Sequence, residues 1–258
     1  MLILEDFDPD SPAVIDPFRI HRQEKILPDT AISCFTGDMF RELLINICSE
    51  PAEAADYTAG MGRTVHTAIY KGKKLAVYLS PVGAPACAAA LEDIYAMGVR
   101  KAIVFGTCGV LDRTVPDGSV IIPDSAVRDE GTSYHYAPPS DIIQVNPAYG
   151  DIFRKLLDQQ GIPHRTGRVW TTDAVYRETR SKVEKRKKQG CLCVDMECSA
   201  LAAVSQFRHR ELFQFFYAAD NLDADSWDAR SLMPEKNRNR KSKIAELAAE
   251  LAVSISDI

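Results

Sequence analysis

One run of the chain constrains the fold more than any other. It extends from Gly83 to Leu111 and reads GAPACAAALEDIYAMGVRKAIVFGTCGVL. Pro85 and Gly98 predict a helix over about 85–97, because proline favours the first helical turn and glycine the position after the last one. The apolar segment KAIVFG then predicts a buried strand, and another apolar segment, LAVYLS, precedes the run. A strand, a helix and a strand in this order are typical of a parallel βαβ unit.

Similar signals recur along the rest of the chain. Further strands are predicted over 30–35, 118–127, 163–174, 191–194 and 211–220, and a hairpin over 64–80 with its turn at 71–73. Further helices are predicted over 38–48, 148–161, 181–190, 196–206 and 241–255. The expected fold class is therefore α/β, with one domain over 29–258 built on a mixed central sheet flanked by helices. Residues 1–28, rich in Asp and Pro, are expected to form an N-terminal arm.

Composition excludes several classes of function. The chain has 258 residues and a formal net charge of −5, so we expect no general nucleic-acid binding. The basic runs 181–189 and 237–243 lack interleaved aromatic residues and are interpreted as solvated helix faces. The acidic start MLILEDFDPD is unlike a signal peptide, and no apolar run is long enough to span a bilayer, so a cytoplasmic protein without membrane contact is expected.

The seven cysteines indicate reduced thiols and no metal site. Their number is odd and most lie in apolar runs, which favours buried thiols over a disulfide framework. Cys191 and Cys193 are separated by one residue, which is not a usual zinc spacing, and no cluster of histidines completes a site.

Residues that can bind a ligand follow several of the predicted strands. Open α/β sheets bind ligands beyond the carboxyl ends of their strands. Gly37 and Arg41 follow the first strand, Thr107 follows KAIVF, and Asp220 follows FQFFYAA. Glycine-rich turns expose backbone N–H groups to anions, and a hydroxyl or guanidinium adds donors. On spacing alone, these glycines can equally serve only as tight turns. The dinucleotide and P-loop fingerprints are both absent, which argues against a dehydrogenase.

The segment CLCVDMECSALAAV, residues 191–204, places two carboxylates in an otherwise apolar run. Asp195 is expected to cap the helix that follows, and Glu197 lies where the helix dipole favours an acid. One acid would satisfy that need. A second one suits a vicinal diol such as that of ribose, whose two hydroxyls donate to one carboxylate, and Met196 can pack on the sugar face.

At this point the chain resembles the purine nucleoside phosphorylase and uridine phosphorylase superfamily, nucleoside phosphorylase family 1, over about residues 30–255. VDMECSALAAV is similar to its Met-Glu ribose motif, and GDMFR to its phosphate turn, with Met39 in place of proline. The run 81–109 resembles its central turn, helix and strand. Residues 128–139 and 171–180 resemble its base-side loops, and AADNL resembles its Ser-Asp segment.

The resemblance implies that phosphate attacks C1′ of a nucleoside and releases the free base, with a purine favoured. It assigns Glu197 and Met196 to the ribose and Asp220 to protonation of purine N7, helped by Arg230. The remaining assignments are phosphate binding by Gly37, Arg41, Thr107 and Arg63, the last across a subunit interface, and base binding by Cys108, Gly109, Tyr176 and Arg177. It further implies no cofactor besides phosphate as co-substrate, and a homo-oligomer based on dimers, with a hexamer as one arrangement.

Two departures from the family pattern keep alternatives open. Val104 stands where family phosphorylases carry a phosphate-binding Arg, which raises the alternatives of a phosphate-independent nucleosidase and of a non-catalytic nucleoside-binding protein. The loop 176–180 lacks the Gln that uridine phosphorylases use there, although Arg177 and Arg180 keep uridine phosphorylase as an alternative. Tyr134 and His135 are held as further contacts of the base or of a partner.

Overall fold

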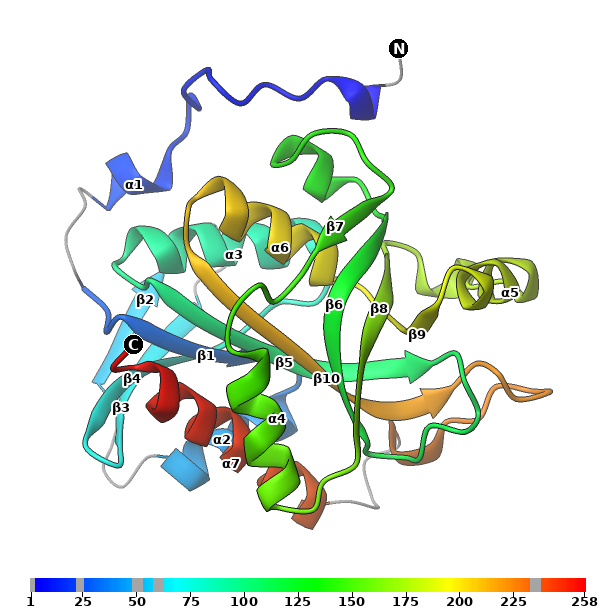
Figure 1. The fold of residues 1–258 in the computed structure, drawn as a ribbon. Helices are drawn as coiled ribbons and strands as arrows, with labels where there is room; N and C mark the ends of the chain where they lie inside the picture. Colours follow the sequence, from blue (N-terminus) through cyan, green and yellow to red (C-terminus); the bar gives the residue numbers. More distant parts are fainter. Residues whose placement is uncertain (1–2, 22–25, 48–52, 58–62, 233–237) are drawn as a thin grey trace.

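The computed structural model describes residues 3–21, 26–47, 53–57, 63–232 and 238–258, and only the backbone of 53–57, 63 and 238–240. A ten-stranded mixed sheet forms its centre (Figure 1). Strand β5 (Lys101–Val110) pairs in parallel with both β1 (Thr30–Cys34) and β10 (Glu211–Asn221). On the far side of β1 lies β4 (Lys73–Leu79), also parallel. The antiparallel strands β3 (Arg63–Tyr70) and β2 (Glu53–Tyr57) complete that edge.

The other half of the sheet closes into a ring of five strands. Strand β10 pairs antiparallel with β6 (Val120–Asp129), which pairs in parallel with β8 (His164–Thr172). Strand β9 (Cys191–Asp195) lies parallel to β8 and meets the end of β5 antiparallel, at Gly109↔Val194. Short β7 (Ile142–Gln144) adds to β6. Because β5 and β10 run side by side to the same end and β9 crosses it, residues 107–109, 195 and 220 are brought together.

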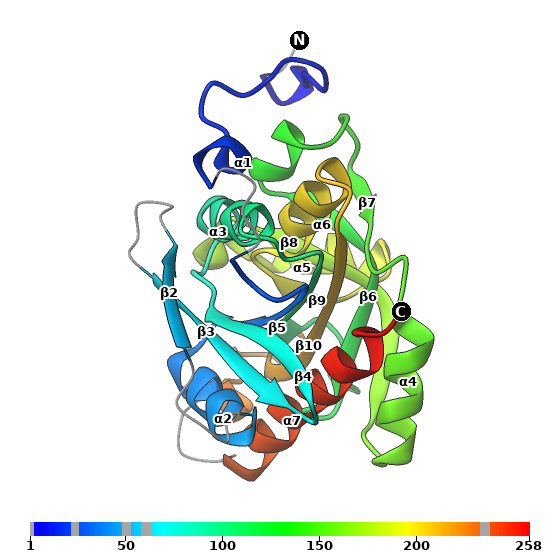
Figure 2. The ribbon, with the colours of Figure 1, turned by 90° about the vertical axis from the view of Figure 1, so that its left-hand side faces the viewer.

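Helices cover the sheet in two groups (Figures 1 and 2). Helices α3 (Ala84–Ala96) and α6 (Cys198–Phe207) pack together on one side. On the other side α7 (Arg238–Ile255) packs against α2 (Gly37–Ile47) and α4 (Gly150–Gln159). Helix α5 (Arg180–Lys188) lies beside β9. The short elements are α1 (Pro17–Ile20) and the 3-10 turns η1 (Ile3–Glu5), η2 (Thr132–His135), η3 (Val175–Arg177) and η4 (Arg230–Leu232).

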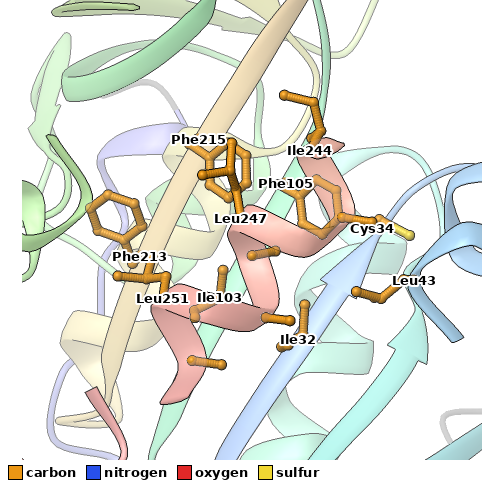
Figure 3. Packing of buried hydrophobic residues seen from close by; sticks show 14 of the residues in the cluster. Ile32, Cys34, Leu43, Ile103, Phe105, Phe213, Phe215, Ile244, Leu247 and Leu251 are labelled. Atoms are coloured by element: carbon orange, nitrogen blue, oxygen red, sulfur yellow. The ribbon is translucent and has the colours of Figure 1, made fainter. Parts of the chain in front are cut away.

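The largest core cluster lies between the sheet and α7 (Figure 3). Phe105 of β5 stacks on Phe215 of β10, with ring centroids 5.1 Å apart and an angle of 3° between the rings. Leu247 and Leu251 of α7 pack onto the same cluster and are fully buried. Burial of this apolar surface therefore holds the C-terminal helix against the two central strands.

The predicted α/β architecture is confirmed, with two strands missed. The βαβ unit is present, and β1 lies between its two strands. The hairpin over 64–80 is also present as β3 and β4. Strands β2 and β7 were not predicted from the sequence. Apart from Cys48, which lies outside the described residues, the cysteines are buried and free, as expected.

The N-terminal segment lies across α3 and the end of α6. Helix α1 packs on α3, and the ring nitrogen Nε2 of His21 lies 3.3 Å from Oδ1 of Asp93. The Arg208 guanidinium lies 5.0 Å from the ring centroid of Phe18. The arm therefore has a docking surface on its own chain. Within the described ranges, none of the helices has the length and apolar character that crossing a bilayer requires.

Phe215→Ala is expected to destabilise the fold by about 3–5 kcal/mol, because it leaves a cavity beside Phe105 and removes a fully buried ring. Urea denaturation followed by circular dichroism measures this loss. The control is Ile45→Ala on α2, where the side chain is 64% exposed, with an expected change within about 0.5 kcal/mol. Equal losses in the two variants would contradict the assigned core.

Candidate active site

A cavity of about 210 Å³ opens at the carboxyl ends of β5, β9 and β10. Thr107, Cys108 and Gly109 line it from β5. Four carboxyl groups line it as well, those of Asp195, Glu197, Asp220 and Glu178. Apolar side chains complete the wall: Phe35, Val82, Val175, Val194, Met196, Leu222 and Leu232. The site is thus an acidic pocket with an apolar rim.

Asp195 caps α6, as the sequence predicted. Its Oδ2 accepts hydrogen bonds from the backbone N–H of Glu197 at 2.9 Å and of Cys198 at 2.6 Å. Its Oδ1 accepts from the Thr171 hydroxyl at 2.7 Å. Asp195 thus accepts from two N–H groups at the start of α6, and the Thr171 hydroxyl oxygen accepts from a third, that of Ser199, at 3.1 Å.

Glu197 has a different role from capping. Its Oε1 accepts a 2.6 Å hydrogen bond from the backbone N–H of Gly83, which lies at the start of α3. Gly83 has φ of 97°, a conformation that other residues adopt only with strain. The bond fixes the buried Glu197 carboxyl across the turn between β4 and α3, beside Met196 in the cavity lining.

Asp220 closes the opposite part of the pocket. Trp227 donates from Nε1 to its Oδ2 at 2.8 Å. On the other side, a Cβ built on Gly109 would lie 3.2 Å from Oδ1 and 2.4 Å from a methyl group of Leu222. Glycine at 109 therefore gives Asp220 and Leu222 the room to lie over β5.

Glu178 is a cavity residue that the sequence did not single out. It directly follows η3. The resemblance assigned two residues of the same loop, Tyr176 and Arg177, to the base, but both are exposed and do not line the cavity. Tyr176 is 96% exposed. Glu178 belongs to no sequence motif that would have marked it. Only the fold of the loop places it in the cavity lining. Tyr176 and Arg177 stay predictions as base ligands.

The predicted phosphate ligands are only partly brought together. Thr107 lines the cavity, whereas Gly37 and Arg41 are exposed outside it, and Arg41 forms an ion pair with Asp38. The side chain of Arg63 lies outside the described residues. Val104 is buried in the core beneath α3, so the position itself faces away from the pocket.

Two other candidates, Arg230 and Tyr134, have structural partners. Arg230 donates to the carbonyl oxygen of Val115 at 2.9 Å and lies 3.5 Å from Asp228. The Arg128 guanidinium stacks over the Tyr134 ring, 4.0 Å from its centroid.

His135 lines a separate hollow of about 660 Å³ beneath the N-terminal segment. That hollow is larger than the acidic pocket, but two of its acids are already paired. Glu92 accepts from Arg208 at 2.6 Å, and Asp93 lies beside His21. We therefore place the chemistry in the acidic pocket.

Electrostatics in the pocket favour protonated carboxyls. Burial, and then the charge of Asp195, raises the pKa of Glu197 to about 8. Burial likewise raises the pKa of Asp195 to about 6, opposed by its three hydrogen bonds. The pKa of Glu178 rises to about 7 through burial and then the charges of Asp220 and Asp195, and burial also raises the pKa of Asp220.

The charged side chains that the structure places in the pocket lining are acidic, so they offer no positive charge to hold an anion. Within the described ranges, none of the residues lining it is Lys or Arg. A search of the same residues for three or more His, Cys, Asp or Glu side chains in metal-binding arrangement found none.

Protonation of Glu197 predicts that the fold loses stability as the pH rises. Its pKa is about 8 in the folded chain against an ordinary value of 4.5, so between these values the folded state binds more protons than the unfolded state. The free energy of unfolding therefore falls between about pH 5 and pH 8. Glu197→Gln is expected to reduce that fall by about 2 kcal/mol or more, since one pKa unit corresponds to about 1.4 kcal/mol. Urea denaturation across this range measures it, and a pH slope equal to that of the natural chain would contradict it.

Comparisons with known proteins identify the family of this chain. The sequence model of one protein family, the phosphorylase superfamily, matches residues 30–255. A purine nucleoside phosphorylase DeoD-type from Bacillus cereus is 32% identical over 201 residues, which cover 76% of this chain and 83% of the relative. The corresponding protein from Bacillus cytotoxicus is 27% identical over the same coverage.

Solved structures show the same fold. The crystal structure of uridine phosphorylase from Vibrio fischeri ES114 superimposes with a TM-score of 0.72 at 22% identity, covering 93% of each chain. Its complex with 6-hydroxy-1-naphthoic acid gives a TM-score of 0.71 at 20% identity, over 92% of this chain and 97% of the other. Sequence motifs, family model and fold agree, and the chain belongs to the phosphorylase superfamily.

Proposed function

We propose that the chain is a nucleoside phosphorylase, a pentosyltransferase that cleaves the N-glycosidic bond of a purine nucleoside with phosphate. The products are the free base and ribose 1-phosphate. Membership of the phosphorylase superfamily supports the reaction class, and the names of the sequence relatives support the purine. The superimposed structures carry the name of the rival activity, uridine phosphorylase.

The observation that carries the proposal is the orientation of Glu197. A carboxyl that only served α6 would bond to that helix, but this one bonds to Gly83 at the start of α3 and lines the cavity. With Met196 beside it, the site suits the diol and the apolar face of ribose. The charge that develops on C1′ in the transition state is positive, and those carboxyl groups of the pocket that are ionised would stabilise it.

The base is proposed to lie toward Asp220, Cys108 and Gly109. Purine rings offer a nitrogen that a carboxyl group can protonate and N–H groups that it can accept from. The uracil of uridine instead presents two carbonyl oxygens and one N–H group, and it has no ring nitrogen with a free lone pair that a carboxyl group could protonate. The resemblance assigns the proton donor to Asp220, with Arg230 as its helper.

Phosphate is proposed to bind near Thr107, at the end of β5, with Gly37 and Arg41 at the start of α2. Arg63 of a second subunit would add charge, which the acidic lining makes necessary. We accordingly propose a homo-oligomer based on dimers. No cofactor is required besides phosphate as co-substrate, and salvage of nucleosides in the cytoplasm is the proposed setting.

A second candidate is a nucleosidase that uses water. The observation that favours it is the lining of the pocket, where no Lys or Arg is found among the residues the structure describes. Water needs no cationic site, whereas a phosphate dianion next to four carboxyl groups does.

Product formation from inosine, adenosine and uridine, with and without phosphate, tests the function. We expect phosphate-dependent release of base from the purine nucleosides and accumulation of ribose 1-phosphate. Release of free ribose without phosphate would establish the second candidate instead. Faster turnover of uridine would assign the rival base, and no turnover of any substrate would favour a binding role.

Glu197→Gln tests the ribose contact. We expect a loss of about 10–100-fold in kcat/KM for inosine, because a hydrogen bond to a charged or strongly polar group is worth about 1.5–3 kcal/mol. The loss should be smaller for 2′-deoxyinosine, which lacks one of the two hydroxyls. Steady-state kinetics on both substrates measure the difference. An equal loss on both would remove Glu197 from the ribose site.

A further inference from the structure

Two carboxyl groups in the pocket, those of Glu178 and Asp220, have opposite hydrogen-bonding environments. We propose that Glu178 is the catalytic acid that gives its proton to the leaving base, while Asp220 stays ionised and accepts N–H groups of the base or of its protonated form. This inference rests on the proposed function, and it moves the proton donor from the residue that the family resemblance assigns.

Burial raises the pKa of Asp220, but two groups beside the carboxyl oppose that shift and favour its charged form. Trp227 donates to Oδ2 at 2.8 Å, and the guanidinium of Arg230 is close enough to lower the pKa of the carboxyl. Oδ1 lies against Gly109, where the absence of a side chain keeps the approach open. A carboxylate that already accepts one N–H and lies near a cation is a poor proton donor.

Trp227, which donates to Asp220, is held in place by the fold of its own loop. Residues 221 and 228 form an isolated β-bridge, which folds the chain back so that Trp227 returns to the end of β10. Arg180 donates to the carbonyl oxygens of Leu222 at 2.9 Å and Asp225 at 2.8 Å. This cation therefore ties the loop of Trp227 to the segment that carries Glu178.

Glu178 has the opposite surroundings. Its side chain is half-buried and has no hydrogen bond or ion pair with any residue in the described parts of the chain. The charged groups that face it are acids, Asp220 from β10 and Asp195 from β9. Of the neighbouring cations in its own segment, Arg177 is exposed and Arg180 is occupied by the carbonyl groups named above.

These surroundings keep the proton on Glu178 at neutral pH. Burial, and then the two like charges, raises the pKa of Glu178 to about 7. A general acid works best when its pKa lies near the working pH, and a pair of acids held in different environments divides into a proton donor and a charged partner. Glu178 fits the first role and Asp220 the second.

The step balances in atoms and charge. An oxygen of phosphate forms a bond to C1′ while the bond from C1′ to N9 breaks and its electron pair passes into the purine. The proton of the Glu178 carboxyl moves to N7, so the base leaves neutral and Glu178 becomes a carboxylate. The phosphate ester then returns a proton to Glu178 through solvent, which restores the acid.

A substrate that needs no proton separates this role from simple binding. In 7-methylinosine the base already carries a positive charge and leaves neutral without a donor. We expect Glu178→Gln to lower kcat/KM for inosine by about 100-fold or more, as for loss of a general acid, and to change that for 7-methylinosine less than about 5-fold. Glu184→Gln, on α5 with a 57% exposed side chain, is the matched control and should alter neither.

The pH profile gives a second readout. For the natural chain, kcat/KM for inosine should fall above about pH 7 as Glu178 loses its proton. In Glu178→Gln this alkaline limb should disappear, and in Glu178→Asp, which keeps an acid and guards against a folding defect, it should persist. Circular dichroism and thermal unfolding check that each variant is folded.

Three results would overturn the inference. In the first, Glu178→Gln loses activity equally on both substrates. In the second, Asp220→Asn shows the selective loss on inosine while Glu178→Gln does not, which would restore the family assignment. In the third, the folded natural chain cleaves neither purine substrate with phosphate, which would reject the proposed purine reaction itself and with it a proton transfer to N7.

Discussion

The site depends on the pairing of β5 with two different strands at its carboxyl end. Parallel pairing with β10 places Asp220 beside Gly109, and antiparallel pairing with β9 places Val194 opposite the same glycine. Three strand ends that lie far apart in the sequence therefore meet over one residue without a side chain. Any Cβ at 109 would meet Leu222 at 2.4 Å, so the close approach requires glycine.

Glu197 then links this junction to the rest of the sheet. Its hydrogen bond to Gly83 connects the start of α6, which follows β9, to the start of α3, which follows β4. Asp195 supplies the capping bonds, so Glu197 is free to make this contact. The two acids of one short segment thus have separate tasks, one local and one across the pocket, and this division explains why an apolar run carries both.

The sequence predicted the parts of the molecule that have a strong local signal. The helix with Pro85 and Gly98 and the apolar strands follow from periodicity and end residues, and the sequence motifs taken together identified the family. Strands β2 and β7 were missed because each is short and has no alternating apolar pattern of its own. Each forms a strand only by pairing with a neighbouring strand. Glu178 was missed for another reason, because the tertiary structure decides whether a loop residue faces the pocket. The neighbouring Tyr176 was predicted as a base ligand because an aromatic ring can stack on a base, yet it is 96% exposed.

Charge balance constrains how an anion can enter such a pocket. Four carboxyl groups face a phosphate dianion poorly, and the pocket lining described by the structure adds no cation. Each proton that burial retains on Glu178, Glu197 or Asp195 removes one negative charge from the path of the phosphate. Burial of the acids, which costs stability at high pH, is thus the condition under which an acidic site can admit an anionic nucleophile at all.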